Sequence, residues 1–237
     1  MARTRRFNVD SLHNAEAQAP VTLPEAQRRH VHVLRLKPGD EVEVFDGEGR
    51  VWRARLDQDR SRVFLIEAHQ TDSDRPRLLL ATAWPKGKRS ATLVEKCAEL
   101  GVDEIVPLRC ARSVVNKDAE GAGHERLCRI AAEAAKQSGR ADVPVITADC
   151  TIAQLLDGLP VDTHTILVDP RADMSLIDVL GARPEADHCL MVGPEGGFTE
   201  EEYREALGLG AQPAQLGANV LRVETAAIAV CALAALM

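Results

Sequence analysis

The sequence has no pair of cysteines close enough together to build a zinc site or a redox motif. Such sites need two or more Cys or His residues within a few positions of one another. A chain of 237 residues can also bury a core that is stable without disulfides. We therefore expect no metal and six reduced, buried thiols, which are Cys97, Cys110, Cys128, Cys150, Cys189 and Cys231.

Long hydrophobic runs are lacking as well. The longest apolar stretch, Thr225 to Met237, is shorter than the roughly 20 residues that a membrane-spanning helix needs. The segment MARTRRF is basic, but polar residues follow it where a secretory signal carries an apolar run. The sequence also has no internal repeat and no low-complexity tract. We expect a cytoplasmic protein with no membrane partner.

Positive charge is scarce overall but is not evenly spread. The chain has a formal net charge of −7, which by itself disfavours binding to nucleic acid. Residues 1–62 hold 12 Lys and Arg against 10 Asp and Glu, a net charge of +2, and the remainder holds 17 against 26, a net charge of −9. A basic binding module joined to an acidic catalytic body would have this asymmetry, and so would a mixed surface without a partner.

Short β-rich runs with turn residues between them fill the N-terminal part. The runs EVEVF, VWRARL and RVFLIEA lie between Asp40 and Ala68, punctuated by turn residues such as Asp46-Gly47. This pattern predicts antiparallel strands joined by tight hairpins, in a small barrel or sheet. The polar stretch from His69 to Pro76 is typical of a linker. We therefore expect one domain over residues 1–72.

After the linker, strand-like and helix-like segments alternate. Strands are expected at residues 78–84, 104–108, 143–147, 165–168 and 189–192, and helices at 90–100, 125–138, 152–156 and 176–180. The alternation predicts an α/β domain over residues 73–237, with an open, mostly parallel sheet covered by helices. Ligands of such sheets bind outside the carboxyl ends of the strands.

One of these strands runs into a glycine-rich loop, Met191-Val-Gly-Pro-Glu-Gly-Gly-Phe-Thr-Glu-Glu-Glu202. Thr199 with Glu202 forms a capping box that fixes the start of the next helix, and glycines at 193, 196 and 197 let the backbone approach a ligand. The spacing differs from both the dinucleotide fingerprint and the phosphate-binding loop, which disfavours a dinucleotide-dependent oxidoreductase. A tight strand-to-helix turn without a ligand is the alternative interpretation.

A second loop with similar features lies close to the C-terminus. In Leu216-Gly-Ala-Asn-Val-Leu-Arg-Val-Glu-Thr-Ala-Ala227, a strand ends in a glycine loop and the polar cluster Arg222, Glu224 and Thr225 opens an alanine-rich helix. The two loops would lie side by side if their strands are neighbours. Arg222 could also be a surface residue, or a structural partner of Glu224.

These two segments resemble the two signature loops of the RsmE family of SPOUT methyltransferases, which modify 16S ribosomal RNA at N3 of a uridine. Further blocks resemble the same family, and they extend over nearly the whole chain. One position departs from the family pattern, because Ala141 stands where members often have Asn. The resembling blocks are Arg6-Phe7, His30 to Arg35, Phe45-Asp46-Gly47, Lys88, Glu95 to Val102, Pro107, Ala111-Arg112-Ser113 and Glu133 to Arg140.

The resemblance implies a C-terminal SPOUT domain with a deep trefoil knot, an exception to the rule against threading, and a small N-terminal PUA-like β-barrel. It also implies S-adenosylmethionine as cofactor, bound between the two loops in a pocket that a second subunit completes, and hence a homodimer. The implied cofactor-binding residues are Met191, Val192, Gly193, Glu195, Gly197, Leu216, Gly217, Leu221, Thr225 and Ala226.

The resemblance further implies methylation of a uridine at N3 in 16S ribosomal RNA of the small subunit. Arg222 is the expected catalytic cation, because negative charge spreads over the uridine carbonyls as N3 loses its proton. Arg6, Arg112 and Arg140 are the expected RNA contacts. The general base stays open between Glu195, which could instead cap the next helix, and water.

Two alternatives fit the same residues. One is a knotted methyltransferase acting on transfer RNA or on another ribosomal site, because the loops describe the cofactor and not the nucleotide. The other is a ribosome-assembly factor that binds RNA without catalysis. The intact glycines of both loops and Arg222 disfavour this second alternative, because a decayed site would not need them.

Overall fold

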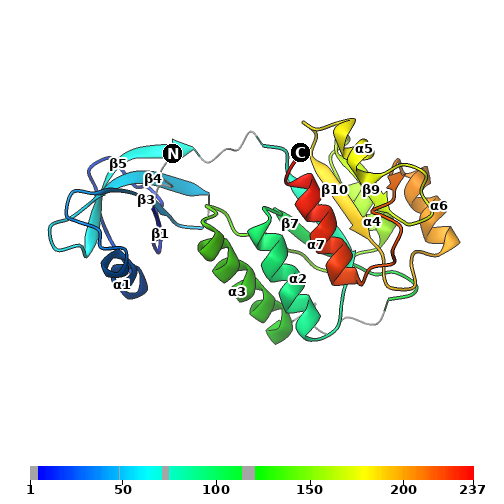
Figure 1. Ribbon diagram of the computed structural model, residues 1–237, viewed down its shortest axis with the longest axis horizontal. Coiled ribbons are helices and arrows are strands. Elements are labelled where there is room, and N and C mark those ends of the chain that lie inside the picture. Colours follow the sequence, from blue (N-terminus) through cyan, green and yellow to red (C-terminus); the bar gives the residue numbers. More distant parts are fainter. Residues whose placement is uncertain (1–4, 48, 71–74, 114–120) are drawn as a thin grey trace. The chain divides into compact units, whose positions relative to one another are not determined.

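A computed structural model of the chain describes residues 5–47, 49–70, 75–113 and 121–237 (Figure 1). The chain divides into two compact units. The N-terminal unit comprises Met1–Asp74 and Ala135–Val143, and the sheet unit comprises Arg75–Ala134 and Pro144–Met237. Residues 71–74, inside the stretch predicted as a linker, lie outside the described residues. No described helix has both the length and the apolar composition that a bilayer crossing requires.

A mixed five-stranded sheet with one helix forms the N-terminal unit. The strand order is β1-β3-β4-β5-β2, in which β3, β4, β5 and β2 pair antiparallel and β1 pairs parallel with β3. The hairpins predicted from alternating residues are confirmed, whereas the parallel strand and the helix were not predicted. The elements are β1 (Arg6–Asn8), β2 (Pro20–Thr22), α1 (Glu25–Val33), β3 (Glu41–Phe45), β4 (Arg50–Leu56) and β5 (Arg62–Gln70).

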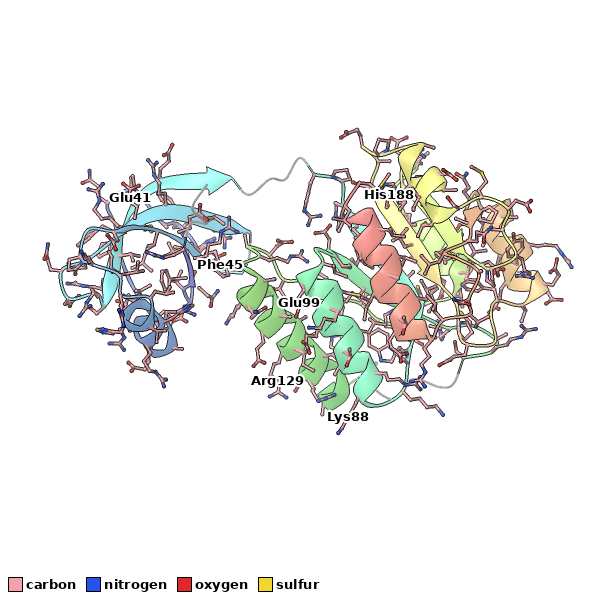
Figure 2. The ribbon with its side chains drawn as sticks, in the orientation of Figure 1. Glu41, Phe45, Lys88, Glu99, Arg129 and His188 are labelled. Carbon is pink, nitrogen blue, oxygen red and sulfur yellow. The ribbon has the colours of Figure 1, made fainter. Side chains whose placement is uncertain are left out.

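A segment from the middle of the chain completes this unit. Ala141 is only 4% exposed and packs with Phe45 and Val51 (Phe45 is labelled in Figure 2). Its carbonyl oxygen accepts a hydrogen bond from the amide of Gly49 at 2.9 Å. A small apolar side chain at position 141 therefore has a packing role in the N-terminal unit.

Six parallel strands form the sheet of the second unit, in the order β11-β9-β10-β6-β7-β8. The predicted parallel α/β architecture is confirmed. The strand expected at 143–147 is shorter, because only Val145 and Ile146 pair with β7. The strands are β6 (Leu78–Ala83), β7 (Glu104–Leu108), β8 (Val145–Ile146), β9 (His164–Val168), β10 (His188–Val192) and β11 (Gln212–Ala214).

Helices cover both faces of this sheet. On one face α4 and α6 pack over Ala81, Cys189 and Met191. On the other face α7 lies across β6 and β10 and contacts α2 along its length, as the red and green helices of Figure 1 show. Lys88 begins α2 and Glu99 ends it (Figure 2). The helices are α2 (Lys88–Glu99), α3 (Gly121–Ser138), α4 (Ile152–Gly158), α5 (Leu176–Gly181), α6 (Glu200–Gly208) and α7 (Val223–Ala234).

Two histidines lie together at the amino ends of neighbouring strands. The rings of His164 on β9 and His188 on β10 are 5.3 Å apart between centroids, and both residues are buried. Burial, with smaller contributions from the charges of His164 and Arg183, lowers the pKa of His188 from 6.5 to about 4. The folded protein therefore holds His188 neutral in a range where the unfolded chain is protonated.

We predict that the free energy of unfolding falls as the pH is lowered from about 6.5 to about 4, partly because of His188. In that range the unfolded chain binds a proton that the folded chain does not, so stability is lost with falling pH. Urea denaturation at pH 7 and pH 5 should show a smaller pH dependence for His188→Gln than for the wild type. Equal pH dependence in the two proteins would contradict this role of His188.

Candidate functional site

A cavity of about 370 Å³ opens at the carboxyl edge of the parallel sheet. This is the edge at which ligands of open α/β sheets bind. Its walls are three loops that follow β9, β10 and β11, together with Arg112 after β7 and Ala226 on α7. The lining residues are Arg112, Val168, Asp169, Pro170, Arg171, Val192, Gly193, Pro194, Glu195, Gly196, Gly197, Phe198, Leu216, Gly217, Asn219, Val220, Leu221 and Ala226.

The two glycine loops share this cavity, but not because their strands are neighbours. Strand β9 lies between β10 and β11 in the sheet. The loop after β9, Val168 to Arg171, therefore contributes a third wall. This loop was not among the predicted site residues, although its place after an apolar strand is a signal that the sequence contains.

Most of the predicted cofactor residues line the cavity, and two do not. Met191 is fully buried in the sheet below it, and Thr225 is exposed on the first turn of α7. Neither residue is among those lining the cavity. The predicted residues that line it are Val192, Gly193, Glu195, Gly197, Leu216, Gly217, Leu221 and Ala226.

The glycine-rich loop after β10 has close packing at one glycine and an unusual backbone at another. A Cβ on Gly193 would lie 2.9 Å from the ring of Phe198, which is itself only 3% exposed. Gly197 has φ +69°, and its amide donates a hydrogen bond to the carbonyl oxygen of Pro194 at 2.8 Å. The loop turns tightly before the predicted capping box of Thr199 and Glu202, which is confirmed.

Arg112 reaches this loop from the segment that follows β7. Its guanidinium donates a hydrogen bond to the carbonyl oxygen of Gly196 at 2.6 Å. The amide of Ala111 donates to Oε1 of Glu202, also at 2.6 Å, which anchors the segment to the start of α6. Among the described residues, Arg112 has no carboxylate partner. Within the described ranges, therefore, no ion pair balances the positive charge that Arg112 brings to the cavity wall.

Asp169 and Arg171 form a rigid charged pair in the third wall. Nε and Nη2 of Arg171 donate to the two carboxylate oxygens of Asp169 at 2.8 and 2.9 Å. The same guanidinium pairs with Glu200 at 3.2 Å and lies 4.3 Å over the ring of Tyr203. Burial alone would raise the pKa of Asp169, but its hydrogen bonds with Arg171 and the positive charge outweigh burial and lower it.

Arg222 and Glu224 do not form the structural pair that was considered as an alternative. Arg222 is the exposed N-cap of α7 and forms no ion pair with any residue in the described ranges. Glu224 pairs instead with Arg89, which also pairs with Glu195 in the glycine-rich loop. Glu195 does not cap α6, because Thr199 occupies that position.

The other two predicted RNA contacts lie in the N-terminal unit and are engaged there. The guanidinium of Arg6 pairs with Glu43 and donates to the carbonyl oxygen of Gly139, each at 2.5 Å. Arg140 pairs with Asp142 at 2.6 Å, and its side chain is only 10% exposed. Contact of either residue with RNA stays a prediction.

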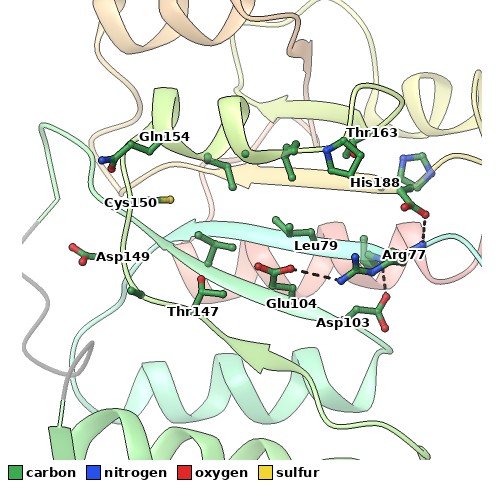
Figure 3. A pocket seen from close by; sticks show the side chains of 18 of the residues that line it. Arg77, Leu79, Asp103, Glu104, Thr147, Asp149, Cys150, Gln154, Thr163 and His188 are labelled. Atoms are coloured by element: carbon green, nitrogen blue, oxygen red, sulfur yellow. Dashed lines mark hydrogen bonds and ion pairs between the residues drawn. The ribbon is translucent and has the colours of Figure 1, made fainter. Parts of the chain in front are cut away.

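A larger hollow, of about 680 Å³, runs beside α4 from the amino ends of β6, β7 and β10 to Cys150, which lies next to Leu108 at the carboxyl end of β7 (Figure 3). Several of its charged groups pair with one another. Arg77 pairs with Glu104 at 3.7 Å, and Arg109 pairs with Asp149 at 3.3 Å. Because neither glycine loop lines this hollow and both line the smaller cavity, we assign function to the smaller cavity.

The smaller cavity is suited to an organic ligand and not to a metal ion. It combines apolar side chains with exposed glycine backbone and a few charged groups, a mixture typical of cofactor sites. Within the part of the chain that the structure describes, no group of three or more His, Cys, Asp or Glu could hold a metal ion.

Sequence comparisons show what the chain is similar to. Residues 73–235 match the family model of the RNA methyltransferase domain, and residues 23–67 match that of the RNA methyltransferase PUA domain. Ribosomal RNA small subunit methyltransferase E from Synechocystis is 34% identical, over 88% of this chain and 70% of that protein. The protein of the same name from Bacillus subtilis is 28% identical, over 94% and 92% of the two chains.

A solved structure agrees with the sequence comparison. The fold resembles ribosomal RNA small subunit methyltransferase E from Neisseria gonorrhoeae, whose crystal structure holds S-adenosyl methionine. The TM-score is 0.76 at 30% identity, and the match covers 97% of this chain and 96% of the other.

We predict that Gly193→Ala destabilises the protein, because the added Cβ would meet the buried ring of Phe198. Overpacking of this kind typically costs about 1–3 kcal/mol. Gly217→Ala is the matched control, since nothing lies within 4 Å of a Cβ at position 217. Urea denaturation should show the loss for Gly193→Ala only. Equal stability of the two variants would mean that the ring of Phe198 moves aside freely.

Proposed function

The chain belongs to the RNA methyltransferase family represented by ribosomal RNA small subunit methyltransferase E, and from this premise we propose that it methylates a uridine of 16S ribosomal RNA at N3 with S-adenosylmethionine. Membership confirms the resemblance seen in the sequence. The observation that carries the proposal is the cavity at the carboxyl edge of the sheet, in which both signature loops meet.

The residues of the cavity fit S-adenosylmethionine. Apolar side chains of Val192, Leu216 and Leu221 offer walls for adenine, and the glycine backbone offers hydrogen-bonding groups. Bound S-adenosylmethionine supplies a methyl group on a positively charged sulfonium. The carboxylates of Asp169 and Glu195, both in the cavity wall, are already paired with Arg171 and Arg89, so we assign them to shaping the wall and not to balancing this charge.

The chain's own contribution to methyl transfer is alignment and stabilisation of charge. The residues must hold the uridine with N3 in line with the methyl group, which removes the entropic cost of a bimolecular encounter. As N3 loses its proton, negative charge spreads to the flanking carbonyl oxygens, and a fixed cation nearby stabilises it. We propose Arg222 for this role, because it follows the cavity residue Leu221 and is free of carboxylate partners among the described residues.

The contacts of Glu195 favour water as the proton acceptor. Nη1 of Arg89 lies 3.3 Å from Oε1 of Glu195, so this carboxylate is engaged in an ion pair within the protein. We therefore propose that Glu195 lines the cofactor site and that solvent takes the proton.

RNA binding is proposed for Arg112 in the sheet unit and for the N-terminal unit, with Arg6 and Arg140 as its contacts. The match of residues 23–67 to the PUA domain of RNA methyltransferases supports RNA binding by the N-terminal unit. RNA binding by Arg112 is supported by its positive charge beside the cavity, which no carboxylate among the described residues pairs with. The proposed partner is 16S ribosomal RNA or the small subunit, which places the protein in the cytoplasm.

We propose that residues 1–72 form the PUA-like barrel and residues 73–237 the SPOUT domain with its trefoil knot. The proposal of the knot rests on membership of the family. Strand β11 lies at the edge of the sheet, yet α7, which follows it, packs over β6 and β10 in the middle. We propose a homodimer because two exposed apolar residues, Val220 and Leu221, line the cavity.

The proposal predicts N3-methyluridine when the protein is incubated with S-adenosylmethionine and unmodified 16S RNA or small subunits. Mass spectrometry of nuclease digests would identify the product and its position. A parallel reaction with unmodified transfer RNA tests the alternative substrate. Methylation of transfer RNA alone would overturn the assignment, and tight RNA binding without methylation of either substrate would favour an assembly factor.

We predict that Arg222→Ala lowers the rate of methyl transfer by about a hundredfold or more, as loss of one preorganised donor typically does. Cofactor affinity should change little, because the charge it stabilises exists only in the transition state. Single-turnover methylation with saturating cofactor and RNA isolates this step. A wild-type rate there would reduce Arg222 to a structural residue.

A further inference from the structure

Arg89, which lies outside the two signature loops, forms an ion pair with one carboxylate in each signature segment. Arg89 is the second residue of α2. Its Nη1 lies 3.3 Å from Oε1 of Glu195 and 3.6 Å from Oε2 of Glu224. Glu195 belongs to the loop between β10 and α6, and Glu224 to the first turn of α7. A single guanidinium therefore bridges the two elements that line opposite parts of the cavity.

The Glu224 arm of this bridge is largely removed from water. The side chain of Glu224 is 12% exposed, and its Oε2 has no hydrogen-bond partner in the described part of the chain. Among the described residues, Arg89 is the one cation that pairs with Glu224, and a buried carboxylate that loses its countercharge is strongly unfavourable. The pairing with Arg89 thus constrains the position of the start of α7. The cavity residues Leu221 and Ala226 lie on either side of this point in the chain.

The Glu195 arm is more exposed but sits in the cavity wall itself. Its side chain is 56% exposed and flanked by Pro194 and Gly196, which also line the cavity. Backbone hydrogen bonds within the sheet do not join the two loops directly, because β9 separates β10 from β11. The side chain of Arg89 supplies a direct link between them.

We propose that Arg89 is a positioning residue that holds the two loops at the spacing that the cofactor requires; the inference rests on the proposed binding of S-adenosylmethionine. Without Arg89, the free protein populates the binding-competent arrangement less often. The apparent affinity then falls in proportion to that population. Once the cofactor is bound and the loops are in place, the chemical step itself is unaffected.

Arg89→Met, which keeps an unbranched apolar stem and removes the guanidinium, should raise the Kd for S-adenosylmethionine about tenfold in calorimetry, within the range of measured couplings between contacting residues. The KM for the cofactor should rise similarly while the rate at saturating cofactor is retained. A general loss of folded protein would instead lower that rate and leave KM unchanged. Arg89→Lys should recover part of the affinity.

Lys96→Met is the matched control, since Lys96 lies on the same helix and pairs with two carboxylates, Glu95 and Glu99, each at 2.8 Å. It should leave the Kd at the wild-type value. In a background carrying Glu195→Gln and Glu224→Gln, Arg89→Met should have no further effect. A persisting effect there would mean that Arg89 touches the cofactor directly, and an unchanged Kd for Arg89→Met alone would also overturn the proposal.

Hydrogen exchange of the cofactor-free protein separates this inference from the proposed function. Amides of residues 193–197 and 216–222 should exchange faster in Arg89→Met than in the wild type, and unchanged exchange would overturn the bridge. Failure of the wild type to bind S-adenosylmethionine would instead overturn the proposed cofactor. If Arg89→Met does not fold, Glu224→Gln, at a residue that does not line the cavity, breaks the other contact alone and gives the same two measurements.

Discussion

The parallel arrangement of the six-stranded sheet is the constraint on which the site depends. Parallel register from β11 to β8 brings every carboxyl end to one edge, so the loops after β9, β10 and β11 must converge there. Helices packed on both faces fix the sheet and leave this edge open. The cavity is therefore a consequence of strand order, and the signature residues acquire their function from where that order places them.

Local signals in the sequence were sufficient for most elements and for much of the site. Alternating residues predicted the N-terminal hairpins, and the capping box at Thr199 predicted the start of α6. The wall formed by Asp169 and Arg171 was missed because it follows from the position of β9 between β10 and β11, which no local pattern encodes. Arg89 was missed for a similar reason, since 106 positions separate it from Glu195 in the sequence.

The N-terminal unit shows why net charge by itself is a weak guide to RNA binding. Many of its arginines pair with acids on neighbouring strands, as Arg53 does with Glu67 and Arg55 with Glu41. The unit also recruits residues 135–143, which overlap the resembling block Glu133 to Arg140 and include Arg140, a predicted RNA contact. Packing of Ala141 and the hydrogen bond from Arg6 to Gly139 give part of that block a structural role beside any role with RNA.

The arginines around the cavity divide by whether a carboxylate already compensates them. Arg171 forms ion pairs with Asp169 and Glu200. Arg89 forms ion pairs with Glu195 and Glu224. Carboxylates of the protein therefore largely neutralise both positive charges. A guanidinium neutralised in this way stabilises new negative charge less effectively than one without a countercharge. Arg112 and Arg222 have no such partner among the described residues. On this electrostatic ground we propose that the first pair shapes the walls and that the second pair acts on the substrate, where negative charge arrives or develops.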